Sequence, residues 1–172
     1  MANDYLIVDG YNIIFAWEEL RELAKVNLEA ARAKLADILC NYQGFVKEGV
    51  ILVFDGHKTK GNLGSVIAYH NIDIVYTKEA QSADTFIEAV VQQRGRHNRI
   101  RVATSDYAEQ IVILGQGASR ISARELQIEI EEIEKQIRKE YTEKLVTKRN
   151  SLLDNISPEM AKILEQMRLK KD

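Results

Sequence analysis

Short runs of apolar and β-branched residues alternate with longer helical patterns along this 172-residue chain. Five such runs predict strands, at residues 5–8, 50–54, 72–76, 100–103 and 118–121. Apolar positions at spacings of three and four predict helices over about 27–43, 83–94 and 107–114. Strands that alternate with helices are typical of an α/β fold with a mainly parallel sheet. We expect the first, second and fourth runs to be its central strands.

From Ser122 onward the pattern is that of charged helices. Ser122 and Glu125 form a capping box, and the apolar positions that follow keep helical spacing to about residue 150. Pro158 marks the start of a closing helix. At 1.5 Å per residue the long helix would reach roughly 40 Å, so part of it should project. We predict a core over residues 1–125 and a helical extension over 126–172, packed on the core or projecting from it.

Composition restricts the class of protein. With 45% hydrophobic and 29% charged residues, the chain is typical of soluble globular proteins. It has no signal-peptide pattern and no apolar run of the roughly 18 to 20 residues that a membrane span needs. Cys40 is the only cysteine, which excludes an intrachain disulfide and fits a reducing compartment. We therefore expect a cytoplasmic protein without a membrane partner; its oligomeric state is left open.

Carboxylates follow three of the predicted strands. Asp9, Asp55 and Asp106 come just after strand ends, and Asp84 and Glu88 lie one turn apart at the start of a predicted helix. Because the carboxyl ends of parallel strands meet at one edge of a sheet, these acids should converge there. Crowded carboxylates repel one another unless a proton or a cation lies between them. The set therefore favours a magnesium site, since Mg²⁺ prefers oxygen ligands.

Each acid also has an ordinary structural explanation. Asp9 could be a turn residue that ends a strand, and Glu88 could lie on a solvated face. Asp84 and Asp106 could be helix N-caps or acids in the first turn of a helix. Asp55 begins an Asp-Gly turn, so we expect it to touch metal less than the others. Taken together, the acids favour a functional cluster over coincidence.

Motifs of competing chemistries are missing from the sequence. It contains no phosphate-binding loop of the Gly-x-x-x-x-Gly-Lys-Ser/Thr type, no complete dinucleotide-binding motif and no Gly-x-Ser-x-Gly elbow. Of the three histidines, His57 alone falls at the expected acid edge, where it could contact phosphate or assist proton transfer.

Four motifs in order carry a resemblance to a known family. They are Asp9-Gly10-Tyr11-Asn12, Val53-Phe54-Asp55-Gly56, Ser82-Ala83-Asp84-Thr85-Phe86-Ile87-Glu88 and Ala103-Thr104-Ser105-Asp106. From residue 4 to about 145 the chain resembles a YacP-type NYN domain, which has a PIN-like, three-layer α/β nuclease fold. The resemblance implies a metal-dependent endoribonuclease.

This resemblance also implies site residues and partners. The invariant acids of the family would fall on Asp9, Asp84 and Asp106. Asn12 would be a polar companion among the catalytic residues, and Glu88 an outer metal ligand. The chain is also similar to a ribosome-associated endonuclease that cuts messenger RNA in the A site, so the implied partners are messenger RNA and the ribosome.

The implied reaction is phosphodiester hydrolysis assisted by Mg²⁺ or Mn²⁺. For the substrate, Tyr11 is a better candidate than Trp17 for stacking on a base, although core packing is the commoner role of aromatic residues in such a pattern. Ser105 is expected to contact phosphate. Cations that follow strand ends would hold the RNA backbone, and these are Lys58, Lys60 and Lys78. The first two lie in a stretch, residues 56–65, that is rich in glycine and is predicted to be a mobile loop.

A second basic group precedes a strand and should lie at the opposite edge of the sheet. It consists of Arg94, Arg96, Arg99 and Arg101. The ordinary explanation for this group is a solvated loop. If the protein docks on a ribosome, the group is a better surface for ribosomal RNA than for the scissile strand.

Two other functions stay open. One is a non-catalytic adaptor that binds RNA or the ribosome on a nuclease fold. The other is a metal-dependent phosphatase that acts on small phosphomonoesters. The three acids count against the first, and the loop over 56–65 suits a polymer better than a small ester.

Overall fold

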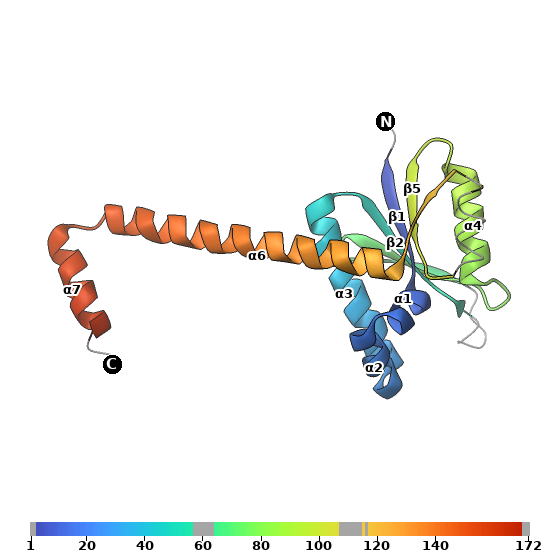
Figure 1. Ribbon diagram of the computed structural model, residues 1–172, viewed down its shortest axis with the longest axis horizontal. Coiled ribbons are helices and arrows are strands. Elements are labelled where there is room, and N and C mark those ends of the chain that lie inside the picture. Colours follow the sequence, from blue (N-terminus) through green and yellow to red (C-terminus); the bar gives the residue numbers. More distant parts are fainter. Residues whose placement is uncertain (1–2, 57–63, 107–114, 116, 170–172) are drawn as a thin grey trace. The chain divides into compact units, whose positions relative to one another are not determined.

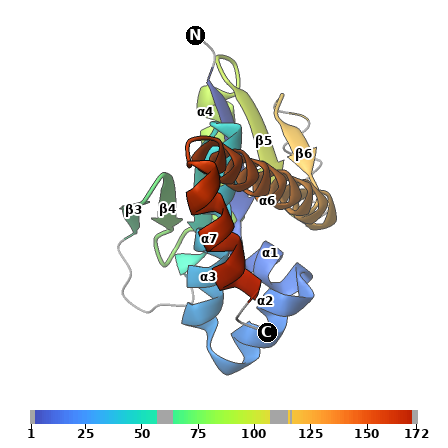
Figure 2. The ribbon, with the colours of Figure 1, turned by 90° about the vertical axis from the view of Figure 1, so that its left-hand side faces the viewer.

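In the computed structural model, the residues described are 3–56, 64–106, 115 and 117–169, without the side chains of 150–154. Within them six strands form one sheet (Figure 1). They are β1 (Asp4–Asp9), β2 (Gly49–Phe54), β3 (Ser65–Tyr69), β4 (Ile72–Tyr76), β5 (Arg99–Ala103) and β6 (Ser119–Ile121). The order is β3-β4-β2-β1-β5-β6, so that β3 and β6 are the outermost strands (Figure 2).

The sheet confirms the predicted α/β class. The pairs of β1 with β2, β1 with β5, β2 with β4 and β5 with β6 are parallel, and β3 runs antiparallel to β4. The three runs expected to be central, β1, β2 and β5, lie inside the sheet. Their side chains are buried on both faces, which explains why they read as continuous apolar runs.

Helices cover both faces of this sheet (Figure 1). On one face α4 (Ala83–Arg94) buries Ile87 and Val91 against Ile7, Val53 and Val102. On the other face lie α1 (Gly10–Ala16) and α3 (Leu28–Val46), joined by α2 (Glu18–Val26). The result is a three-layer arrangement, helix on sheet on helix.

The predicted elements differ from the structure in a few places. The helices predicted over 83–94 and 27–43 are α4 and α3. Helices α1 and α2 and strand β3 were not predicted. The helix predicted over 107–114 and most of the loop predicted over 56–65, with Lys58 and Lys60, lie outside the described residues.

Gly10 allows α1 to begin directly at the end of β1. A Cβ atom here would lie 2.4 Å from Cε1 of Phe54 and 3.0 Å from the carbonyl oxygen of Val53. A side chain does not fit in this space without displacing Phe54. The glycine therefore sets the first turn of α1, with Tyr11 and Asn12, against the carboxyl edge of the sheet.

The C-terminal part is helical, as predicted. Helix α6 (Ala123–Asp154) begins with the expected capping box, in which the Ser122 N–H donates to Glu125 at 2.7 Å and the Glu125 N–H donates to Ser122 at 3.1 Å. Helix α7 (Pro158–Leu169) follows. The chain divides into two compact units, residues 1–131 and 132–172. None of the helices in the described ranges has the length and apolar character needed to cross a membrane.

Candidate active site

Carboxylates from four parts of the fold line one cavity at the carboxyl edge of the sheet. Asp9 ends β1, Asp55 follows β2, Asp84 lies in the first turn of α4 and Asp106 follows β5. The cavity has a volume of about 510 Å³, and we call it the acid cavity. Its other lining residues are Tyr11, Asn12, Phe15, Ala16, Ala83 and Ser105. The three acids expected to bind metal are thus brought together, and Asp55, the one we expected least, joins them.

Asp9 is the buried acid of this group, with 8% of its surface exposed. Its burial raises the pKa to about 6, and the carboxylates of Asp84, Asp55 and Asp106 add to the increase. The Asn12 N–H donates to Asp9 Oδ1 at 3.4 Å, so Asp9 also caps α1, and this bond lowers the pKa. Asp9 also ends β1, the ordinary explanation that we considered for it, whereas its capping of α1 was not expected from the sequence. The hydrogen bond lowers the pKa of Asp9 by less than burial raises it, and burial therefore favours a proton or a cation at this carboxylate.

Asp84 is half-buried and is not the cap of its helix. The cap of α4 is Ser82, whose Oγ accepts from the Thr85 N–H at 3.2 Å. Burial raises the pKa of Asp84, and the carboxylates of Asp106 and Asp55 raise it further. Asp84 is therefore a second carboxyl of the acid cavity, beside Asp9, whose pKa is raised by burial and by neighbouring acids.

Asn12 connects α1 to the loop that carries Asp106. Its Oδ1 accepts a hydrogen bond of 2.5 Å from the backbone N–H of Ser105, which is 93 residues away in sequence. The next N–H in this loop, that of Asp106, donates to Thr104 Oγ1 at 3.1 Å. Asn12 therefore holds the loop after β5 at the cavity, a role that residue type alone did not indicate.

Tyr11 lines the acid cavity but is 8% exposed. Its ring packs on Phe54 with the centroids 5.1 Å apart, and its hydroxyl accepts from Nη1 of Arg32 at 2.9 Å. Little of the ring is therefore left for the expected stacking on a base. Trp17, the other aromatic considered, is 5% exposed and donates to the carbonyl of Ala123.

Arg32 was missed at the level of sequence. It lies on α3 three, four and seven residues before Leu35, Ala36 and Leu39, which are all buried, so an arginine occupies the apolar stripe of this helix. That position was the available signal. Arg32 does not line the acid cavity, but its guanidinium contacts Tyr11, which does.

Other predicted residues lie outside the cavity. Glu88 is half-buried, one turn after Asp84, and does not line the acid cavity. Lys78 follows β4 at the same edge and lines a neighbouring cavity of about 260 Å³ with Tyr76 and Gln81. His57 belongs to the part of the chain that is not described.

The donor set fits a cation that keeps water ligands. Among the described residues, no three His, Cys, Asp or Glu side chains are placed to bind one ion together. The cavity offers carboxylate oxygens, and one of the carboxylates is buried with a raised pKa. Mg²⁺ is usually held by one or two carboxylates together with water and substrate phosphate, which is a set that this cavity provides.

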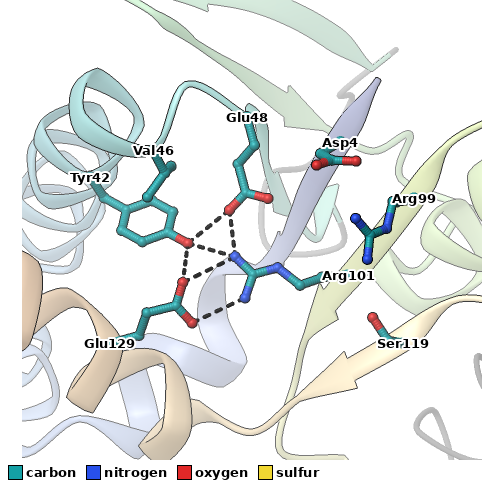
Figure 3. Close-up of a pocket in the computed structure, with 8 residues that line it drawn as sticks. All are labelled: Asp4, Tyr42, Val46, Glu48, Arg99, Arg101, Ser119 and Glu129. Atoms are coloured by element: carbon teal, nitrogen blue, oxygen red, sulfur yellow. Dashed lines mark hydrogen bonds and ion pairs between the residues drawn. The ribbon is translucent and has the colours of Figure 1, made fainter. Parts of the chain in front are cut away.

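At the opposite edge of the sheet, Arg101 is held in a hydrogen-bonded network (Figure 3). It donates to Glu129 at 3.0 Å, to Glu48 at 2.5 Å and to the hydroxyl of Tyr42 at 2.6 Å. These residues line a cavity of about 380 Å³ with Arg99 and Asp4. The basic group expected at this edge is therefore smaller than predicted: Arg101 is neutralised, whereas Arg94, Arg96 and Arg99 are exposed.

Comparison with known proteins gives consistent matches over nearly the whole chain. The family model described as YacP-like NYN domain matches residues 6–169. The "Uncharacterized protein YacP" of Bacillus subtilis (strain 168) is 40% identical over 166 residues, which are 96% of each chain. The crystal structure of Rae1 (YacP) from Bacillus subtilis matches with a TM-score of 0.71 and 38% identity, covering 96% of this chain and 94% of that one. Its W164L mutant matches with a TM-score of 0.69 and 38% identity, over 90% and 86%.

Proposed function

This chain belongs to the YacP-like NYN domain family, whose domain is nuclease-like, and on that premise we propose that it is a metal-dependent endoribonuclease. The proposed reaction is hydrolysis of RNA phosphodiester bonds, and the proposed substrate is messenger RNA in the A site of translating ribosomes. The observation that carries the proposal is the acid cavity, in which Asp9 is buried beside three further carboxylates. The resemblance of the chain to the A-site endonuclease supports the choice of substrate.

The carboxylates fit Mg²⁺ or Mn²⁺ as cofactor. Asp9, Asp84 and Asp106 would hold the ion directly or through water, and Glu88 would be an outer ligand. When bound, the ion supplies positive charge to the scissile phosphate and lowers the pKa of the attacking water. The expected products carry a 5′-phosphate and a 3′-hydroxyl.

Residues of the chain itself orient these groups. The Asn12 N–H fixes the Asp9 carboxylate, and the Asn12 side chain fixes the loop that carries Ser105 and Asp106. Ser105 lines the acid cavity, and its hydroxyl would donate to a phosphate oxygen. Without the ion, the raised pKa of Asp9 allows this carboxyl to retain a proton up to about pH 6.

Cations for the RNA backbone lie beside the acid cavity. Arg32 sits at the hydroxyl of Tyr11, and Lys78 follows β4. Because the whole chain has a net charge of −2, affinity for a polyanion depends on such local groups.

Cleavage of a reporter messenger RNA in a reconstituted translation reaction tests the proposal. Wild type is compared with Asp9→Asn and Asp84→Asn, and Asp4→Asn, at the opposite edge, is the matched control. We expect cuts that require both cavity acids and an engaged ribosome, and that EDTA abolishes on purified complexes. Asp4→Asn should cut like wild type.

Two results would overturn the proposal in favour of the alternatives. Wild type and variants that co-sediment with ribosomes but cut none of several reporters would indicate the adaptor. Hydrolysis of p-nitrophenyl phosphate that depends on Asp9, without any cut in RNA, would indicate the phosphatase.

A further inference from the structure

We propose that Phe15 is a stacking platform for a nucleobase of the RNA strand, next to the bond that is cut. This inference rests on the proposed function and deepens it, because it names the chemical group of the substrate that is held beside the acid cavity. Phe15 was not among the residues that the sequence indicated.

Phe15 is a large apolar side chain at the boundary between the acid cavity and solvent. It is 46% exposed and lines the acid cavity, whereas Ile13 and Ile14 on the same helix are fully buried. Phe15 thus differs from these two isoleucines in exposing nearly half of its surface, at a cavity that four carboxylates line.

The ring of Phe15 is held in a defined orientation. It stacks on the ring of Tyr11, one turn earlier in α1, with the centroids 6.4 Å apart and the planes at 25°. Tyr11 is itself fixed, because it packs on Phe54 and accepts a hydrogen bond from Arg32. Phe15 therefore presents a ring that is supported from the protein side and meets solvent within the acid cavity.

The chemistry of this position suits a nucleobase. A nucleotide whose phosphate enters the acid cavity carries its neutral base beside that phosphate, and the base has a flat π face. Stacking of bases on aromatic side chains is favourable and tolerates any base. The platform is therefore expected to improve affinity with little preference for sequence. Because Tyr11 is buried, Phe15 takes the stacking role for which Tyr11 was the candidate from the sequence.

Fluorescence of a base analogue tests this contact. A short single-stranded RNA with 2-aminopurine at successive positions is titrated with the Asp84→Asn protein, which should not cut it. The same titration is made with added Phe15→Leu, which keeps an apolar side chain but has no ring, and with added Phe15→Trp. Phe45→Leu is the matched control, because Phe45 is 37% exposed and lies near the end of α3, outside the acid cavity.

We expect quenching at one position of the RNA, and its loss in Phe15→Leu with roughly tenfold weaker binding, which is about 1.4 kcal/mol. Phe15→Trp and Phe45→Leu should behave like the parent. Equal quenching and affinity in Phe15→Leu would overturn the proposal. So would RNA that binds without quenching at any position.

The translation assay provides a second readout in case the free RNA does not bind. There Phe15→Leu should reduce cleavage about tenfold and Phe15→Trp should restore it, whereas cleavage by Phe15→Leu at the wild-type rate would overturn the platform. This failure differs from failure of the nuclease function, in which wild type itself does not cut. Circular dichroism of each variant checks the fold, which an exposed position should not disturb.

Discussion

The Asp9 carboxyl carries an electrostatic cost that its structural role does not require. An asparagine caps a helix about as well as an aspartate. The aspartate is nevertheless buried among other carboxylates, and its pKa rises from 3.8 to about 6. A residue that is unfavourable in the metal-free fold and favourable beside a cation is what a metal site needs.

The raised pKa of Asp9 predicts a pH-dependent effect of Asp9→Asn on stability. Below about pH 3 the carboxyl is protonated in both the folded and the unfolded state, so the two proteins should be equally stable. As the pH rises from about 3 to 6, the unfolded chain loses this proton first, and wild type loses stability. Above pH 6 the metal-free variant should be more stable by about 3 kcal/mol, measured by urea unfolding in EDTA. Equal stabilities at pH 7.5 would contradict the burial of charge at Asp9.

Metal binding should reverse the order of these two proteins. An ion that binds only the folded protein stabilises it in proportion to the logarithm of its concentration. Thermal unfolding in increasing MnCl₂ should therefore shift upward for wild type. The shift should be smaller for Asp9→Asn and Asp84→Asn. For Asp4→Asn it should equal the shift of wild type. Similar shifts in all four proteins would indicate binding elsewhere.

Arg32 predicts a contribution to RNA affinity that depends on salt. If its guanidinium neutralises one phosphate, Arg32→Gln should reduce the slope of log affinity against log salt by about 1. Arg21→Gln is the matched control, because Arg21 is exposed on α2 beside Glu22. The affinity is measured with a short RNA between low and moderate salt. An unchanged slope would show that Arg32 contacts no phosphate and serves only to hold the hydroxyl of Tyr11.

At the scale of elements, the space around two helical glycines predicts opposite effects of an alanine on stability. Gly10 lies at the contact between α1 and β2, and Gly44 lies in α3. Gly10→Ala would place a Cβ atom 2.4 Å from Phe54, and such overpacking costs about 1 to 3 kcal/mol. Gly44 lies within α3, and the nearest atom to its Cβ would be 3.9 Å away. Gly44→Ala should therefore stabilise the protein by up to about 1 kcal/mol through helix propensity. Urea unfolding measures the free energy of unfolding of both variants. A loss of stability in Gly44→Ala would contradict the explanation by the space around each glycine.

The strands and the main helices could be predicted from sequence because each carries a local pattern. Strand β3 could not, since it is an exposed edge strand in which Val66 and Ile67 are 70% and 48% exposed and no buried face marks it. Helix α1 was hidden because it begins at Gly10, directly after the last residue of β1, so that no loop separates the two elements.

The candidate site was predictable to a similar degree. Convergence of Asp9, Asp84 and Asp106 follows from the topology of a parallel sheet. The positions of Arg32 and Phe15 depend on how α1 packs against α3 and the acid cavity. Contacts between separate elements leave no spacing in the sequence, so the side chains that complete the cavity could not be predicted.

At the scale of the whole molecule, the two edges of the sheet differ in charge. The carboxyl edge gathers four acids, whereas the other edge exposes Arg94, Arg96 and Arg99 beside the neutralised Arg101. If the second edge contacts ribosomal RNA, replacing the three exposed arginines by glutamine should lower co-sedimentation with ribosomes several-fold. Activity on any RNA that is cut without ribosomes should not change. Undiminished co-sedimentation would exclude this edge as the contact.

The hydrogen bond between Asn12 and Ser105 also bears on the order of synthesis. The acid cavity draws on residue 9 and on residue 106, and β1 pairs with β5 near the middle of the sheet. A nascent chain that has not yet emerged beyond β5 lacks Asp106, the Asn12 contact and one neighbour of its central strand. A nascent copy of the proposed nuclease would therefore lack an assembled acid cavity until the chain beyond Asp106 has been synthesised and has left the ribosome.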